Sequence, residues 1–139
     1  MLFRSILVWK RSAERYLVNS GLDYTIIHPG GLVDTPAGVE EYVLDVNDVL
    51  LNNTKRSISR EDVANLCVAA ISLYQPGQTK IALDCITRPV TVVSDDSIDG
   101  DGTTTTTTAE TTKTTTTIAT ATEALEQFLK KGKVYNYEL

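Results

Sequence analysis

Residues 20–32 of this 139-residue chain read SGLDYTIIHPGGL. The β-branched and aromatic run from Asp23 to Ile27 predicts a short buried strand, and residues 28–31, His-Pro-Gly-Gly, end it in a tight loop. Gly21 stands where a left-handed cap ends a preceding helix. A helix, a short strand and a glycine-rich loop in this order are typical of an α/β fold.

The segment before this stretch predicts an amphipathic helix over residues 6–20, which ends at Asn19 or Ser20. The apolar residues at helical spacing, expected to face the core, are Trp9, Ala13, Tyr16 and Leu17. The basic residues Lys10, Arg11 and Arg15 are expected on the solvated face.

The segment after the loop contains a second helix and a second strand. Residues 40–53 are mixed and predict a short helix or ragged strands. Ser59 and Asp62 form an N-terminal capping box, and the apolar pattern continues to Leu73 before Gln-Pro-Gly at residues 75–77. Residues 79–85 alternate as a strand with Ile81, Leu83 and Cys85 on one face. Strands and helices joined by short turns predict a mainly parallel sheet.

A Thr-rich, low-complexity segment interrupts this pattern over residues 94–122 and is expected to be a disordered insertion. We therefore divide the chain into one domain formed by residues 1–93 and 123–139, with the insertion between them. The last part predicts a short amphipathic helix that docks on the core through Leu125 and Phe128. Insertions in loops cost little, because loop-closure entropy grows only logarithmically with length.

The formal net charge of −5 argues against nucleic acid and anionic membrane surfaces as partners, because both attract clustered Lys and Arg. No window is apolar enough for a membrane-spanning helix. Cys67 and Cys85 lie in apolar runs and are expected to be small buried hydrophobes in a reducing compartment, the cytoplasm or a plastid.

Motifs for phosphate and metal binding are absent. The eight glycines never show a G-x-G-x-x-G or G-x-x-G-x-x-G spacing, so the phosphate-binding βαβ unit of a dinucleotide fold is missing from this chain. The single histidine and two distant cysteines give no metal-ligand pair, and we predict no metal site. His28, at the strand end where α/β proteins bind ligands, is either a pocket residue or a histidine satisfied by backbone.

Three blocks resemble one family. Residues 8–14 (VWKRSAE), 20–32 and 59–64 (SREDVA) are similar, in this order, to the C-terminal half of atypical short-chain dehydrogenases/reductases of the NAD(P)H-binding, NmrA-like group. The resemblance covers residue 5 to about residue 90. It implies a partial Rossmann-like fold, doubly wound with a mostly parallel sheet, and an NADP or NAD cofactor.

The resemblance assigns residue roles. Lys10 falls on the family's lysine that holds the nicotinamide ribose, but Ile6 occupies the position of the proton-donating tyrosine. Pro29, Gly30, Gly31 and Leu32 match the loop whose backbone lies against the nicotinamide end. His28, where the family commonly has arginine, is expected in the substrate pocket. Arg60 and Asp62 are expected to support this loop and to cap the helix, respectively.

These observations leave several functions open. The chain is a truncated or degenerate oxidoreductase, or a non-catalytic binding module that keeps the sheet edge without the chemistry. A third alternative is an interaction protein that works through the Thr-rich segment. We expect the chain alone to be inactive, to bind the dinucleotide only together with the missing half, and to self-associate through an exposed sheet edge.

Overall fold

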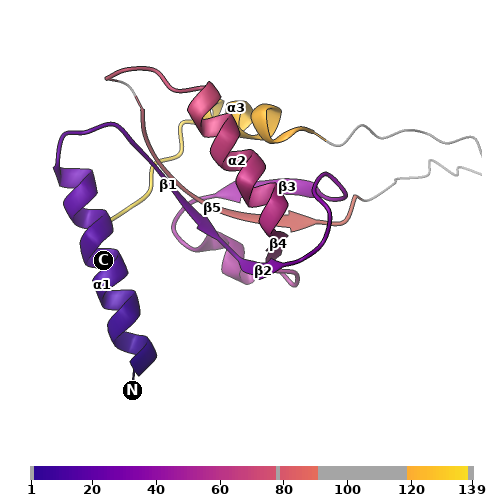
Figure 1. Ribbon diagram of the computed structural model, residues 1–139, viewed down its shortest axis with the longest axis horizontal. Helices are drawn as coiled ribbons and strands as arrows, with labels where there is room; N and C mark the ends of the chain where they lie inside the picture. The colour runs from indigo at the N-terminus through magenta and orange to yellow at the C-terminus, as the bar shows by residue number, and fades with distance from the viewer. Residues whose placement is uncertain (1, 78, 91–118, 138–139) are drawn as a thin grey trace, which may run out of the picture.

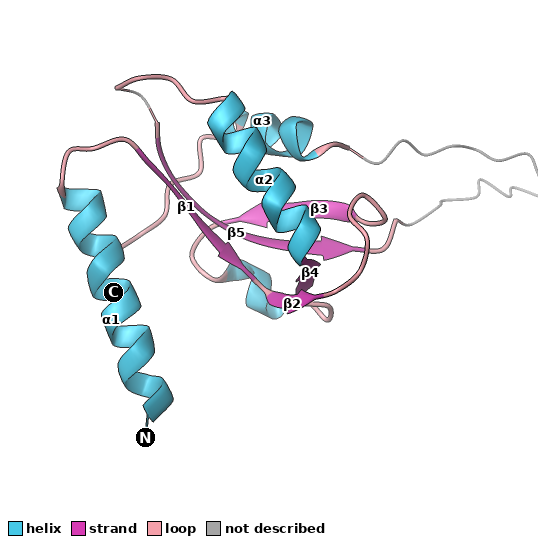
Figure 2. Cartoon of the chain, viewed as in Figure 1, coloured by secondary structure: helices cyan, strands magenta, loops and turns pink. Residues whose placement is uncertain are grey.

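The computed structural model describes residues 2–77, 79–90 and 119–137. In these ranges the helices are α1 (Leu2–Asn19), the 3-10 helix η1 (Val49–Asn52), α2 (Arg60–Ser72) and α3 (Ala121–Lys130). The strands are β1 (Tyr24–Pro29), β2 (Gly31–Val33), β3 (Glu41–Asp45), β4 (Ser57–Ser59) and β5 (Lys80–Arg88). Both a short helix and a strand thus form in the mixed segment 40–53. The fold class is α/β (Figure 2).

The main sheet is small and mixed, which corrects the expected mostly parallel arrangement. Its strand order is β1-β5-β3, with β1 parallel and β3 antiparallel to β5. Beside it, β2 and β4 form a parallel pair. An antiparallel edge strand is a common addition to α/β sheets, since it needs no crossover helix.

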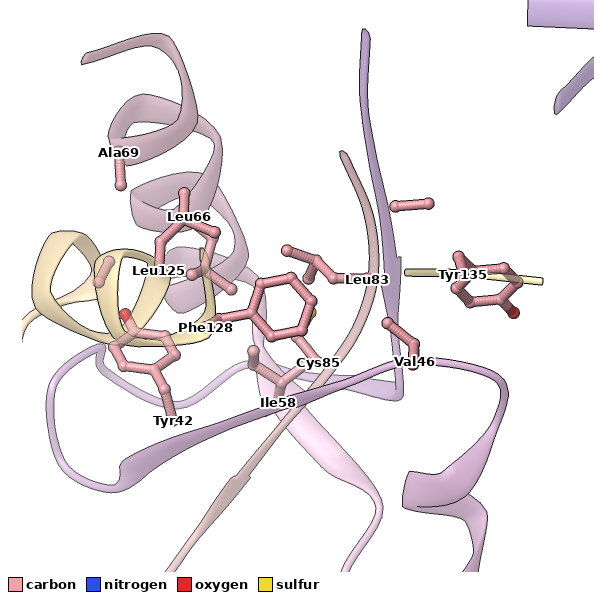
Figure 3. Close-up of a cluster of buried hydrophobic side chains, with 12 residues drawn as sticks. Tyr42, Val46, Ile58, Leu66, Ala69, Leu83, Cys85, Leu125, Phe128 and Tyr135 are labelled. Carbon is pink, nitrogen blue, oxygen red and sulfur yellow. The ribbon is translucent and has the colours of Figure 1, made fainter. Parts of the chain in front are cut away.

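Most of the hydrophobic core lies between β5 and the helices α2 and α3, and Tyr135 extends it on the opposite face of the sheet (Figure 3). Its buried members are Tyr42, Val46, Ile58, Leu66, Ala69, Ala82, Leu83, Cys85, Ala121, Leu125, Phe128 and Tyr135 (Figure 3). Residues 82–87 of β5 are all buried, instead of alternating as predicted, because this central strand is covered on both faces. The predicted docking of Leu125 and Phe128 on the core is confirmed.

Helix α1 lies apart from α2 and α3, on the outer side of β1 (Figure 1). It ends at Asn19, as predicted, and Gly21 has a φ of +78°. The predicted inward face is wrong: Trp9 is 74% and Tyr16 81% exposed. Instead Arg11 and Glu14 are half-buried. Of the four residues predicted to face the core, only Leu17 is half-buried, so periodicity alone did not indicate which face turns inward.

Strand β1 is half-buried rather than buried, because it is the edge of its sheet. The Thr-rich segment lies outside the described residues up to residue 118. Helix α3 starts at Ala121, two residues before the predicted restart at Glu123, with Thr120 as its N-cap in a complete capping box with Glu123. No helix among the described residues combines the length and hydropathy that crossing a bilayer requires.

The two cysteines have opposite environments, which corrects the expectation that both are buried. Cys85 is buried in β5 and Cys67 is exposed on α2. Helix α2 packs through Leu66 and Ala69, and one residue along a helix rotates the side chain by about 100°. Burial raises the pKa of the Cys85 thiol to about 12.

We therefore expect one thiol per native chain to react with Ellman's reagent. Cys67 reacts because it is exposed, whereas Cys85 is both buried and protonated at neutral pH. In denaturant both react. Cys67→Ser should remove the native signal, and a native signal that remains in this variant would contradict the assignment.

Candidate functional site

A cavity of about 310 Å³ opens at the carboxyl end of β1. It is lined by His28, Pro29, Gly30, Gly31, Asp48, Leu50, Leu51, Arg56, Asp84, Cys85 and Ile86. The carboxyl ends of parallel strands are where α/β proteins bind ligands. We take this cavity as the candidate site. A second cavity, of about 370 Å³ between β1 and α2, has a mainly apolar lining and lies away from this edge.

Strand pairing positions the polar side chains of the site. His28 in β1 lies in register with Asp84 in β5, so the two side chains leave neighbouring strands at the same level. Asp48 has a left-handed φ of +58°, and its backbone N–H donates to Asp84 Oδ2 at 2.8 Å. This bond leaves Asp84 Oδ1 directed toward the histidine.

His28 lies between two carboxylates. Its Nε2 is 3.2 Å from Glu14 Oε1 on α1, and its Nδ1 is 3.3 Å from Asp84 Oδ1. The Nδ1 contact with Asp84 lacks good hydrogen-bond geometry. Side-chain carboxylates, rather than the backbone, therefore lie beside both ring nitrogens of this histidine, which also lines the cavity.

The C-terminal segment covers the same histidine. The Tyr135 ring lies 5.1 Å from the imidazole, and the Arg11 guanidinium is 5.5 Å from the ring centres of both Tyr135 and Tyr137. Lys133 pairs with Asp45 at 2.7 Å and holds this segment to the end of β3. The site therefore unites α1, β1, β5 and the C-terminal segment around one imidazole.

The pKa of His28 is raised, first by the Asp84 carboxylate and further by Glu14, against the opposing effect of burial. A group whose folded pKa lies above its unfolded value stabilises the fold fully below the unfolded pKa. That contribution disappears as the pH rises through the folded pKa. The charged imidazole therefore stabilises the packing of α1 against the sheet most strongly at mildly acidic pH.

We expect Glu14→Gln to lower the pKa of His28 and to destabilise the fold more at mildly acidic than at alkaline pH. Proton NMR follows the single histidine directly, and thermal melting at several pH values measures the stability. Glu41→Gln is the matched control, since Glu41 pairs with Arg88 instead. A His28 titration that is the same in Glu14→Gln and the native chain would contradict the ion pair.

The two loop glycines differ in what surrounds them. A Cβ on Gly30 would overlap the carbonyl oxygen of Arg56 and lie 2.9 Å from Ile86 Cγ2, whereas one on Gly31 would lie 3.7 Å from the Arg56 oxygen. The Gly30 N–H donates to Cys85 O at 2.9 Å and the Gly31 N–H to Arg56 O at 2.8 Å. The fold itself therefore requires glycine at position 30.

The predicted site residues are only partly brought together. His28, Pro29, Gly30 and Gly31 line one cavity. Leu32, in β2, is 46% exposed and lies outside that lining.

Lys10 and Ile6 are both exposed on α1 and also lie outside the cavity lining. Sequence reasoning missed Asp84, although a lone acid within the apolar run at residues 81–86 was a usable signal. It also missed Glu14 and Tyr135, which carry no local signal.

The loop that follows the glycines is held from the start of α2. Arg60 Nη1 pairs with Asp34 Oδ1 at 2.6 Å, and Glu61 Oε2 accepts from the Ala37 N–H. Asp62 accepts from Ser59 Oγ, the Tyr42 hydroxyl and the Gly38 N–H at 2.8 to 3.0 Å. Ser59 is the N-cap and accepts from the Asp62 N–H, so the Asp62 side chain orients the capping hydroxyl and holds the loop instead of capping the helix itself. Among the described residues, no cluster of three or more His, Cys, Asp or Glu side chains could hold a metal ion.

Comparison with known proteins gives a family match. A family model described as NAD(P)H-binding matches residues 1–73. The chain is 47% identical over 85 residues to an uncharacterized chloroplastic protein of Arabidopsis thaliana, covering 61% of this chain and 26% of that protein. It is 48% identical over 71 residues to sanguinarine reductase of Eschscholzia californica, covering 51% and 26%.

A more distant relative is the chloroplastic protein TIC 62 of Pisum sativum. The identity is 37% over 70 residues, which cover 50% of this chain and 12% of that protein. The chain spans about a quarter of the length of the two more similar relatives.

Proposed function

The chain belongs to the NAD(P)H-binding family, and from this premise we propose that it supplies the nicotinamide-end half of an atypical short-chain dehydrogenase/reductase domain. The observation that carries the proposal is the cavity at the end of β1, where His28 and the Pro29-Gly30-Gly31 loop meet. The relative named as a reductase supports redox chemistry. Relatives named as chloroplastic favour a plastid over the cytoplasm.

The cavity fits one end of a dinucleotide. Its volume of about 310 Å³ is at the lower limit of small-molecule sites. Its lining places Asp48 and Asp84 beside Arg56 and His28, so the cavity has no excess of positive charge that would favour a pyrophosphate. His28 Nδ1 is a buried polar atom without a good hydrogen bond, and an acceptor on a bound ring could use it. The pyrophosphate has no glycine-rich cradle in this chain.

The residues of this chain hold and orient the bound ring and take no part in the chemical step. When bound, the cofactor supplies a hydride. Gly30 and Gly31 give their loop its close backbone approach, and the two carboxylates fix the orientation and charge of His28. Ile6 cannot donate a proton, so this chain alone is expected to be inactive.

A second candidate function is a non-catalytic binding or regulatory module. The alkyl side chain of Ile6 at the tyrosine position favours it, because the domain then keeps the pocket without the proton-transfer group. The two candidates differ in one measurement. The measurement uses a longer protein that joins a phosphate-binding unit to this chain. If the chain is part of an oxidoreductase, that protein oxidises NADPH when a hydride acceptor is added, and if the chain is a binding module, it does not.

The proposed half-site is tested by NADPH fluorescence titration of the purified chain. We expect no saturable binding in the micromolar range, because half of the dinucleotide has no partner. Sanguinarine reductase serves as the full-length control. Tight binding by the isolated chain would falsify the half-site. If the coding sequence upstream of this chain has no G-x-x-G-x-x-G motif, the chain is not a truncated enzyme. The binding module is then the function that stands.

A further inference from the structure

Two consecutive residues beside the candidate site have a strained backbone. Asn47 and Asp48 have φ values of +59° and +58°, and in the part of the chain that the structure describes they are the only non-glycine residues with a positive φ. This left-handed conformation is unfavourable for a residue with a Cβ. Asp48 lines the cavity, so the strain lies in the cavity wall. Such strain persists only where the surrounding structure holds it in place.

The segment that follows α3 holds this wall from a distant part of the sequence. It runs from α3 toward α1 (Figure 1). The Asn136 N–H donates to Asn47 Oδ1 at 2.6 Å. Lys133 Nζ lies 2.7 and 2.8 Å from the two carboxylate oxygens of Asp45, the last residue of β3. The segment therefore grips the chain at the strained residues and directly before them.

Residues 133–137, which we call the latch, dock through alternate side chains. Lys133, Tyr135 and Tyr137 contact the rest of the protein. Val134, between the first two, is 81% exposed. The latch forms no helix or strand, and Tyr137 Oη is buried without a hydrogen-bond partner among the described residues. A segment with few anchors and an unsatisfied polar group opens locally, at a lower free energy than the whole fold.

We propose that the latch is a releasable strap that sets the shape of the candidate site. While the latch is docked, its two bonds keep the cavity wall in the strained conformation, and Tyr135 lies against His28. When the latch is released, Asn47 and Asp48 relax to negative φ values, and the Asp48 N–H leaves Asp84. The cavity then loses one wall, and the imidazole loses its aromatic neighbour.

A ligand in the cavity controls the latch in return. The latch rests on the proposed function in one respect, since the ligand is taken to be the nicotinamide ring. A ring that needs the formed cavity binds the docked state, so its binding keeps the latch docked. Whatever pulls the latch away weakens the binding of the ring by the same free energy. The site is therefore regulated by residues that lie outside the cavity lining.

Native-state hydrogen exchange of the full chain tests the latch. We expect the amides of Asp48 and Asn136 to become exposed in one shared opening reaction, whereas the amide of Leu83, which is fully buried in β5, needs global unfolding. Lys133→Met should lower the protection of the first two amides about threefold, because one partly exposed ion pair is lost. Lys130→Met is the matched control: it removes the same charge from the exposed end of α3 and should change neither amide. Circular dichroism shows whether each variant folds.

The backbone strain provides a test that a mere packing contact would not pass. In Asp48→Gly the left-handed conformation carries no steric cost, and the N–H that donates to Asp84 is kept. The wall should then stay in place without the latch. Adding Lys133→Met to Asp48→Gly should therefore lower the protection of the Asn136 amide but leave that of residue 48 unchanged. An equal loss at both amides would overturn the role of the strain and with it the proposal.

The ring alone, as 1-methylnicotinamide, separates the latch from the proposed function. At about twice its dissociation constant it should raise the protection of the Asp48 and Asn136 amides about threefold. Proton NMR of the single histidine detects its binding. A probe that does not bind would count against the nicotinamide-end function, and the exchange of the native chain and Lys133→Met then decides the latch. A probe that binds without changing these amides, amides that open independently, or amides that ignore Lys133→Met would each overturn the latch.

Discussion

Replacing Gly30 with alanine is expected to lower the free energy of unfolding by about 3 kcal/mol. The added Cβ overlaps the carbonyl oxygen of Arg56 and crowds Ile86 Cγ2. The backbone cannot yield easily, because the N–H of Gly30 is bonded to β5 and that of Gly31 to Arg56. For a domain of this size we expect the melting temperature to fall by about 15 °C.

Gly31→Ala is the matched control. Its Cβ would make an ordinary contact with the Arg56 oxygen, so we expect a change within about 0.5 kcal/mol, as for other tolerated positions. Denaturant unfolding of both variants measures the difference. Equal stabilities would mean that the close approach of Gly30 to Arg56 is not present in solution.

The second large effect is expected for Asp62→Ala, at about 3 kcal/mol. Asp62 is 3% exposed, and its carboxylate accepts from Tyr42, Gly38 and Ser59. Burial and the neighbouring carboxylate raise the pKa of Tyr42, so its hydroxyl stays protonated and donates. Alanine removes the acceptor of the buried Tyr42 hydroxyl, frees the exposed loop at Gly38 and weakens the start of α2.

Two smaller variants separate these contributions. Tyr42→Phe removes one hydrogen bond and should cost about 1 kcal/mol. Ser59→Ala removes the N-cap and should also cost about 1 kcal/mol. Chemical denaturation followed by circular dichroism gives all three values. If Asp62→Ala costs no more than either single variant, the carboxylate does not connect the cap, the loop and β3.

Local sequence chemistry predicted much of the fold. Gly21 correctly indicated the end of α1, and Ser59 with Asp62 indicated the start of α2. The β-branched run up to His28 indicated β1. These features depend on residues within one turn or strand of each other, so propensity and capping are sufficient to predict them.

Burial was predicted less well. The stripe that contains Trp9 and Tyr16 is exposed, and so is Cys67. Hydrophobic periodicity shows that a helix has two faces, but the neighbouring elements decide which face is covered. In this chain the described neighbours cover the side of α1 that carries Arg11 and Glu14.

The candidate site divides in the same way. The sequence by itself determined the α/β class, the glycine-rich loop after β1 and the family resemblance, because these reside in contiguous residues. Only the tertiary structure decided that Glu14, Asp84 and Tyr135 surround His28, and that Gly30 meets Arg56. The physical reason is distance along the chain: the packing of α1 brings Glu14 to the imidazole, strand register brings Asp84, and the segment after α3 brings Tyr135, and no local pattern encodes these approaches.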